Sequence, residues 1–169
     1  IMYEDAVQIQ PTFKEIFANI ANETGGTFSS NLKRIFRALE KTAMKQATDP
    51  TLDRADNVCD VVRGMLSYPD FGSMLKGIQA TTNHDDVVVM RTKDRFSNPT
   101  SGGWMDIVIN LTFKSDRNDH VSEIQFVHEG LLAVRKACGG HSAYNSYRSA
   151  LEMLEVHGVE NKKSEAVCF

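Results

Sequence analysis

The sequence predicts a single α/β (α+β) domain in which a mixed, largely antiparallel β-sheet of about five strands is flanked by helices. Segments with apolar residues at helical spacing alternate along the chain with short runs rich in β-branched residues. Two of these runs, residues 107–113 and 122–126, are separated by a polar turn and therefore pair most simply as an antiparallel hairpin. With 169 residues, 41% of them hydrophobic, the chain can bury one substantial core.

The N-terminal part of the chain predicts two helices. In the first, residues 11–21, apolar side chains recur at helical spacing until Gly25 and Gly26 stop the pattern. The second begins at a cap, Ser29 or Ser30. Because residues i, i+4 and i+8 lie on one side of a helix, its three cations form a ladder opposite the apolar stripe. The stripe is Leu32, Ile35, Phe36, Leu39 and Ala43, and the ladder is Lys33, Arg37 and Lys41.

The rest of the chain supplies the sheet and the remaining helices. After the break at Asp49-Pro50, residues 60–66 have the pattern of a buried strand, residues 71–79 that of a short helix, and residues 87–90 that of another strand. The hairpin follows, and then two helices at residues 130–138 and 142–156, separated by a glycine pair. We therefore divide the single domain, residues 1–169, into N-terminal helices 1–48, the sheet 56–128, C-terminal helices 129–157 and a polar tail 158–169.

Composition narrows the classes of function. A formal net charge of -3 argues against a general nucleic-acid binder, because no excess of Lys and Arg is left for nonspecific phosphate contacts. Cys59, Cys138 and Cys168 are odd in number and lack metal-ligand spacing, which favours a reducing, cytoplasmic location over a disulfide framework or a zinc site. No apolar run approaches the length of a membrane span. The opening Ile1-Met2 suits a domain taken from a longer protein.

Polar residues on the hairpin predict a site. Strand alternation places four of them on one exposed face, Asp106, Asn110, Glu123 and Gln125, and carboxylates gathered there would need a cation. Mg²⁺ prefers such hard oxygen ligands, and a cationic helix face can hold a polyphosphate. Trp104 follows two glycines, so that a substrate backbone can approach a flat ring on which a base can stack. These residue types together favour transfer of a phosphoryl or pyrophosphoryl group.

The order of these features resembles the synthetase domain of the RelA/SpoT family, within the nucleotidyltransferase superfamily. The shared order is a Lys/Arg-bearing helix, an Asp that opens a strand, a Lys-Asp pair, a Gly-aromatic turn into a strand, and a Glu-x-Gln strand. The resemblance covers residues 31–147 and is one of pattern and spacing. It implies a nucleotidyltransferase-like fold and transfer of a pyrophosphoryl group from ATP to the 3'-hydroxyl of a guanine nucleotide, with Mg²⁺ as cofactor.

The resemblance also implies roles for individual residues. Asp60 corresponds to the metal-binding Asp and Glu123 to the second, catalytic carboxylate, with Asp106 as a third metal candidate. The predicted nucleotide-binding residues are Lys33, Arg37 and Lys41 at the ATP phosphates, Arg63, Lys93 of the Lys-Asp pair, Trp104 in place of a stacking Tyr, and Gln125. By its position, Glu123 is also the better candidate for a general base.

Departures from the family pattern concern the acceptor. Arg63 follows Asp60 by three residues, where the family has its Arg at five, and Val108 stands where the family has a His. Valine cannot make that polar contact, so an altered acceptor pocket on a related fold is expected. The pair His84-Asp85 is similar to part of the family's hydrolase site, but that site needs a separate helical domain, so we expect no hydrolase activity.

Simpler interpretations remain open beside the enzymatic one. A basic ladder opposite an apolar stripe is usually a solvated helix face, and Glu123 and Gln125 are also ordinary residues for the polar side of a hairpin. Two alternatives follow. The same fold could transfer a nucleotidyl or pyrophosphoryl group to RNA or protein, or the domain could be a non-catalytic nucleotide-binding or interaction module of a larger protein. The sequence fixes neither the acceptor nor the oligomeric state.

Overall fold

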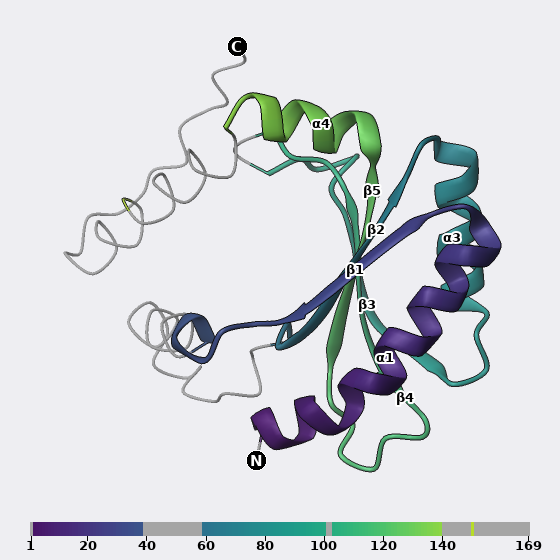
Figure 1. Cartoon of the computed structure of the whole chain (residues 1–169), viewed down its shortest axis with the longest axis vertical. Helices are drawn as coiled ribbons and strands as arrows, with labels where there is room; N and C mark the ends of the chain where they lie inside the picture. Colours follow the sequence, from purple (N-terminus) through teal and green to yellow (C-terminus); the bar gives the residue numbers. More distant parts are fainter. Residues whose placement is uncertain (1, 39–58, 101–102, 140–149, 151–169) are drawn as a thin grey trace.

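The structure, a computed structural model, describes residues 2–38, 59–100, 103–139 and 150. Its centre is a five-stranded sheet with the strand order β1-β2-β5-β4-β3 (Figure 1). The strands are β1 (Thr27–Leu32), β2 (Val62–Tyr68), β3 (Val87–Asp94), β4 (Ile107–Phe113) and β5 (Ser122–His128). Only β2 and β5 pair in parallel, and the other three pairings of this sheet are antiparallel. The predicted mixed, largely antiparallel sheet is confirmed, including the hairpin formed by β4 and β5.

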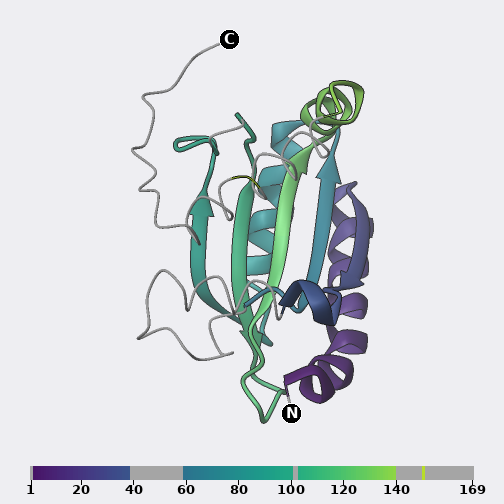
Figure 2. The same ribbon diagram turned by 90° about the vertical axis from the view of Figure 1, so that its left-hand side faces the viewer.

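Helices α1 (Met2–Thr24) and α3 (Phe71–Thr82) pack on one face of this sheet, behind the strands in Figure 2. Helix α4 (Glu129–Ala137) follows β5 at one end of the sheet. The apolar side of the sheet meets α1 closely at Gly64, where an added Cβ would lie 2.8 to 2.9 Å from the rings of Phe28 and Phe13. The core therefore lies between the sheet and α1, and it includes Phe13, Phe17, Leu66, Ile109, Leu111, Phe113, Ile124 and Phe126.

A second close approach joins α3 to the sheet around Tyr68. The ring of Tyr68 is fully buried, and Cβ atoms added at Gly26 and Gly77 would lie 2.6 Å and 2.0 Å from its atoms. The Tyr68 hydroxyl shares a hydrogen bond of 2.9 Å with Thr24. Helix α3 begins where Asp70 accepts a hydrogen bond from the Ser73 amide, as the break before the predicted helix indicates.

The prediction of a second helix from Ser29 or Ser30 is wrong at its start. Residues 27–32 form β1, which pairs along its whole length with β2 and has alternating burial. Pairing with β2 outweighs the weak helical pattern, because strand preference depends on cross-strand packing. Helical structure is described only at residues 35–38, where Ile35 and Phe36 are exposed rather than buried in a stripe. Lys33 precedes this turn, so Lys33 and Arg37 do not form a helical ladder, and Lys41, Leu39 and Ala43 lie outside the described residues.

The other helix predictions differ mainly at their ends. Helix α1 starts at Met2 rather than residue 11 and contains Pro11, and β3 continues to Asp94. Helix α4 matches the prediction for residues 130–138 to within one residue at each end. The helix predicted for residues 142–156 and the polar tail fall outside the described ranges, except for residue 150. Among the helices that the structure describes, none combines the length and apolar character needed to cross a membrane.

Candidate active site

A row of five polar residues crosses the sheet, one from each strand. The strand registers place them side by side in the order Asn31, Arg63, Glu123, Asn110 and Arg91. The row lies on the face away from α1 and α3, because the next residues along β2 and β5, Gly64 and Ile124, point into the core. This is the face turned towards the viewer in Figure 2. A continuous polar row on the face of the sheet away from the helices marks a candidate site.

Hydrogen bonds join neighbouring members of the row. Arg63 Nε donates to Asn31 Oδ1 at 3.0 Å. Arg91 Nε and Nη2 both donate to Asn110 Oδ1, at 3.0 Å and 2.8 Å. Asn110 Nδ2 lies 3.5 Å from Glu123 Oε2, and Gln125 Nε2 lies 3.3 Å from the other oxygen, Glu123 Oε1. Glu123 therefore stands between two side-chain amides that orient its carboxylate.

Asp60 lies in the turn just before β2, where it forms an ion pair with Lys33. Lys33 Nζ is 2.7 Å from Asp60 Oδ2, and the two side chains are only 10% and 13% exposed. Two further contacts hold this segment: the Lys33 amide donates to the Val61 carbonyl at 2.8 Å, and the Tyr3 hydroxyl donates to the Lys33 carbonyl at 2.7 Å. Burial raises the pKa of Tyr3, and the nearby charge of Asp60 raises it further.

Asn110 also connects the Asp60 turn to Glu123. Its Nδ2 atom donates to the Cys59 carbonyl at 3.3 Å, while the same atom faces Glu123. Because β2 and β5 run in parallel and Arg63 is in register with Glu123, the turn that carries Asp60 and the first residues of β5 lie at the same end of the sheet. The two acidic segments are thus both within reach of one side-chain amide.

Asp106 has partners different from those we predicted. It was expected on an exposed patch with Asn110, but it is fully buried, and Asn110 is only 1% exposed. Arg95 Nη1 lies 2.9 Å from Asp106 Oδ1, and the indole Nε1 of Trp104 donates to Asp106 Oδ2 at 2.8 Å. A buried carboxylate needs such partners, so Asp106 fixes the edge of the Trp104 ring.

Trp104 is held from a second side as well. The Arg135 guanidinium of α4 lies 4.3 Å from the centre of the indole ring, in a cation–π contact. The preceding Gly103 has φ of +72°, a left-handed conformation that favours glycine, and its amide donates to the Thr100 carbonyl. The glycine before the aromatic residue is therefore required by the turn that presents Trp104.

Among the remaining predicted residues, Lys93 and Gln125 lie on the same face of the sheet. Lys93 is in register with Val108, which in turn pairs with Gln125, so these three side chains form the row next to the polar one. Arg37 lies in the helical turn after Lys33. We did not predict Asn31 or Arg91 as part of the site. The signal for Arg91 was its position two residues before Lys93 on a strand, which puts both cations on one face.

The residues present fit a magnesium ion shared with a substrate. Within residues 2–38, 59–100 and 103–139, no three His, Cys, Asp or Glu side chains gather in a way that could hold a metal by themselves. Mg²⁺, however, is usually bound by one or two carboxylates together with substrate phosphates and water. Asp60 and Glu123 can supply that number of carboxylates, and Arg63 and Lys93 add positive charge on the same face.

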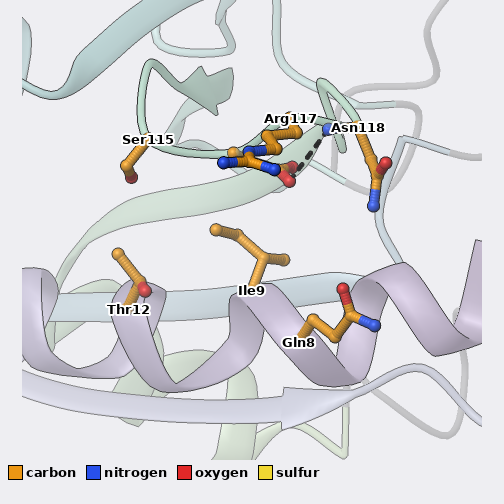
Figure 3. Close-up of a pocket in the computed structure, with 7 residues that line it drawn as sticks. Gln8, Ile9, Thr12, Ser115, Arg117 and Asn118 are labelled. Carbon is orange, nitrogen blue, oxygen red and sulfur yellow. Dashed lines mark hydrogen bonds between the residues drawn. The ribbon is translucent and has the colours of Figure 1, made fainter.

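A separate pocket lies between α1 and the loop after β4 (Figure 3). Its volume is about 470 Å³. The lining residues are Gln8, Ile9, Thr12, Ser115, Asp116, Arg117 and Asn118. A hydrogen bond of 3.1 Å from the Asn118 amide to Asp116 closes the loop on itself. None of these lining residues belongs to the polar row, so we do not assign the pocket to the candidate site.

Comparison with known structures identifies the fold. No protein-family model and no curated protein matches the sequence. A GTP pyrophosphokinase family protein from Streptococcus pneumoniae is similar in structure, with a TM-score of 0.69 and 13% identity over 92% of this chain and 84% of that one. Small alarmone synthetase 1 from Bacillus subtilis gives a TM-score of 0.68 at 14% identity, over 92% and 85% of the two chains. The structure of the same synthetase bound to its product pppGpp gives a TM-score of 0.64 at 15% identity, over 94% of this chain and 85% of that chain.

The chain therefore has the fold of RelA/SpoT-like synthetases, as its motifs predicted. At identities of 13% to 15% the likeness establishes the fold and leaves activity to be argued from the site. The similar structures include small alarmone synthetases and a GTP pyrophosphokinase family protein, and this chain shares their fold at low sequence identity.

Proposed function

We propose that this domain transfers a pyrophosphoryl group from ATP to the 3'-hydroxyl of a nucleotide, in a reaction that depends on Mg²⁺. The observation that carries the proposal is the parallel pairing of β2 with β5, which sets the Asp60 turn and Glu123 at one end of the polar face. Asn110 contacts both segments there. Phosphoryl transfer requires mainly positioning and neutralisation of charge, and acidic groups surrounded by cations on one rigid sheet provide both.

In this proposal each group of residues has one task. Asp60 and Glu123 hold Mg²⁺, which when bound neutralises charge on the phosphates and orients them. Lys33, Arg37 and Lys41 contact the ATP phosphates, while Arg63, Lys93 and Gln125 face the nucleotides from the sheet. If Asp60 held a divalent ion, the Lys33 ammonium, which contacts Asp60 at 2.7 Å, would instead contact a phosphate oxygen.

The acceptor is activated and held by residues at the two ends of β4 and β5. Glu123 takes the proton of the 3'-hydroxyl, whose oxygen then bonds to the β-phosphorus of ATP, and AMP leaves. Trp104 supplies a ring on which the acceptor base stacks, and its ring position is fixed by Asp106 and Arg135. Val108, in register with Gln125, leaves the acceptor base without the polar contact that a His would give.

The test uses γ-labelled ATP with Mg²⁺ and a panel of acceptors: GDP, GTP, AMP, ADP and tRNA. Products of the wild-type domain are resolved by chromatography and compared with those of Asp60→Asn and Glu123→Gln. The control is Glu15→Gln, which removes the same charge from an exposed position on α1. We expect one labelled nucleotide product that both site variants lose and the control keeps. Labelled tRNA would instead assign an RNA acceptor, and no labelled product from any acceptor would overturn the proposal in favour of a non-catalytic module.

A further inference from the structure

Asn110 is the buried residue that joins the parts of the candidate site. We infer that Asn110 is a positioning residue, which holds Glu123 and the Asp60 turn in one fixed relation, and this inference rests on the proposed function. Asn110 is 1% exposed and lies in the middle of β4, where the neighbouring positions Ile109 and Leu111 are apolar. A buried amide at such a position is costly unless its hydrogen-bonding groups are used.

The orientation of the Asn110 amide follows from its partners. Arg91 can only donate, so the atom that receives both of its N–H groups must be the amide oxygen. The NH₂ group then points the other way, towards the Cys59 carbonyl at 3.3 Å and the Glu123 carboxylate at 3.5 Å. Both of these groups are acceptors. The contacts of the side chain therefore agree with one orientation and exclude the flipped one.

This arrangement gives Asn110 an effect on both acidic segments. Its contact with the Cys59 carbonyl fixes the peptide next to Asp60, and its contact with Glu123 orients a carboxylate from a different strand. Groups that orient metal-binding side chains from behind commonly change metal affinity or activity about 10- to 100-fold when removed. Arg91 supports the effect indirectly, because its two donors hold the amide in place.

A purely structural role for Asn110 makes a different prediction. If the amide only satisfied the buried groups around it, its loss would lower stability without altering the dependence of the reaction on Mg²⁺. If Asn110 has a positioning role, loss of its amide should loosen the Asp60 turn and raise the Mg²⁺ concentration that the transfer reaction needs. Part of the lost rate should then return at high Mg²⁺. The Lys33 amide is a suitable reporter of the turn, because it donates to the Val61 carbonyl next to Asp60.

The experiment compares Asn110→Leu and Asn110→Asp with the control Thr112→Val. Leucine keeps the branching at Cγ and removes every hydrogen bond, whereas aspartate keeps the shape and the acceptor for Arg91 but loses both donors. Thr112 is buried on the same face of β4, two residues further along. Hydrogen exchange of the Lys33 amide is measured by NMR in all four proteins. The Mg²⁺ concentration for half-maximal transfer is measured for wild type, Asn110→Leu and Thr112→Val, with the acceptor that the panel identifies.

We expect exchange of the Lys33 amide to be faster, on the order of five-fold, in both Asn110 variants and unchanged in Thr112→Val. We also expect Asn110→Leu to need about ten-fold more Mg²⁺. Unchanged exchange in the Asn110 variants, or an unchanged Mg²⁺ requirement in an active Asn110→Leu, would overturn the inference while leaving the proposed function intact. A third outcome is that exchange is faster in the Asn110 variants but the wild-type domain transfers nothing to any acceptor. That outcome would overturn the proposed function and leave Asn110 as the residue that orders the turn.

Discussion

Lys33 and Asp60 form an ion pair of 2.7 Å at the point where β1 ends and β2 begins. We had assigned the two residues to different tasks, Lys33 to phosphate and Asp60 to metal. We propose that the two tasks are linked, because a divalent ion at Asp60 would compete with the Lys33 ammonium for the same carboxylate oxygen. In the structure, Lys33 neutralises the largely buried Asp60 carboxylate, as a buried charge requires.

The pairing predicts opposite effects of Lys33→Met on metal and on ATP. On the proposed function, the ammonium and a divalent ion would compete for one carboxylate oxygen, so removing the ammonium should strengthen binding of Mn²⁺ alone, measured by electron paramagnetic resonance. The same change should raise the KM for ATP about ten-fold, since a phosphate contact is lost. Lys14→Met, an exposed position on α1, serves as the control. Weaker Mn²⁺ binding in Lys33→Met would show that the two cations do not compete.

The sequence predicts the sheet better than it predicts the N-terminal connection. Alternation in residues 107–113 and 122–126 was strong enough to identify β4, β5 and their antiparallel pairing. Strand β1 was missed because Thr27–Leu32 carries little periodicity of its own and becomes a strand by pairing with β2. The parallel contact between β2 and β5 could not be predicted from local pattern, because it joins segments about sixty residues apart.

The candidate site was predictable to a similar degree. Alternation placed Asn110 and Glu123 on the same face, and the register confirms it. It could not show that Asn110 is buried, because that depends on Arg91 and the Cys59 carbonyl covering it. Asp106 shows the same limit. It precedes β4, outside the regular alternation, and Arg95 and Trp104 determine its environment.

Trp104 is the only tryptophan of the chain, so its fluorescence reports directly on the proposed acceptor platform. We predict that the acceptor nucleotide quenches this fluorescence, because a stacked base contacts the ring. Trp104→Leu should raise the KM for the acceptor about 5- to 150-fold and leave the KM for ATP unchanged, in keeping with a stacking contribution of about 1 to 3 kcal/mol. Trp104→Phe keeps an aromatic face, so its KM for the acceptor should lie between those of wild type and Trp104→Leu. An equal rise in both KM values would indicate general disruption instead of a lost platform.

The contact between Gly77 and Tyr68 predicts a strong effect on stability. In Gly77→Ala the new Cβ would lie 2.0 Å from the Tyr68 hydroxyl oxygen and 2.6 Å from Cζ, inside a fully buried environment. We expect the free energy of unfolding in urea to fall by about 1 to 3 kcal/mol, the usual cost of overpacking a core. Gly72→Ala makes the same substitution in the same helix, where the atom nearest to the added Cβ is an Asp70 oxygen at 3.1 Å. Equal losses in both variants would mean that the Tyr68 contact is not the cause.

His120 predicts a dependence of stability on pH. Burial lowers its pKa, although the charges of Asp116 and Asp5 act in the opposite direction, and its Nε2 atom is buried without a hydrogen bond to the described part of the chain. As the pH falls below the ordinary histidine value of about 6.5, the unfolded chain binds a proton that the folded chain resists, so the free energy of unfolding decreases. Between pH 7.5 and about 5.5, wild type should therefore lose more stability in urea than His120→Gln, whatever the difference between the two proteins at pH 7.5. Parallel losses in the two proteins over this range would show that His120 is as easily protonated in the fold as outside it.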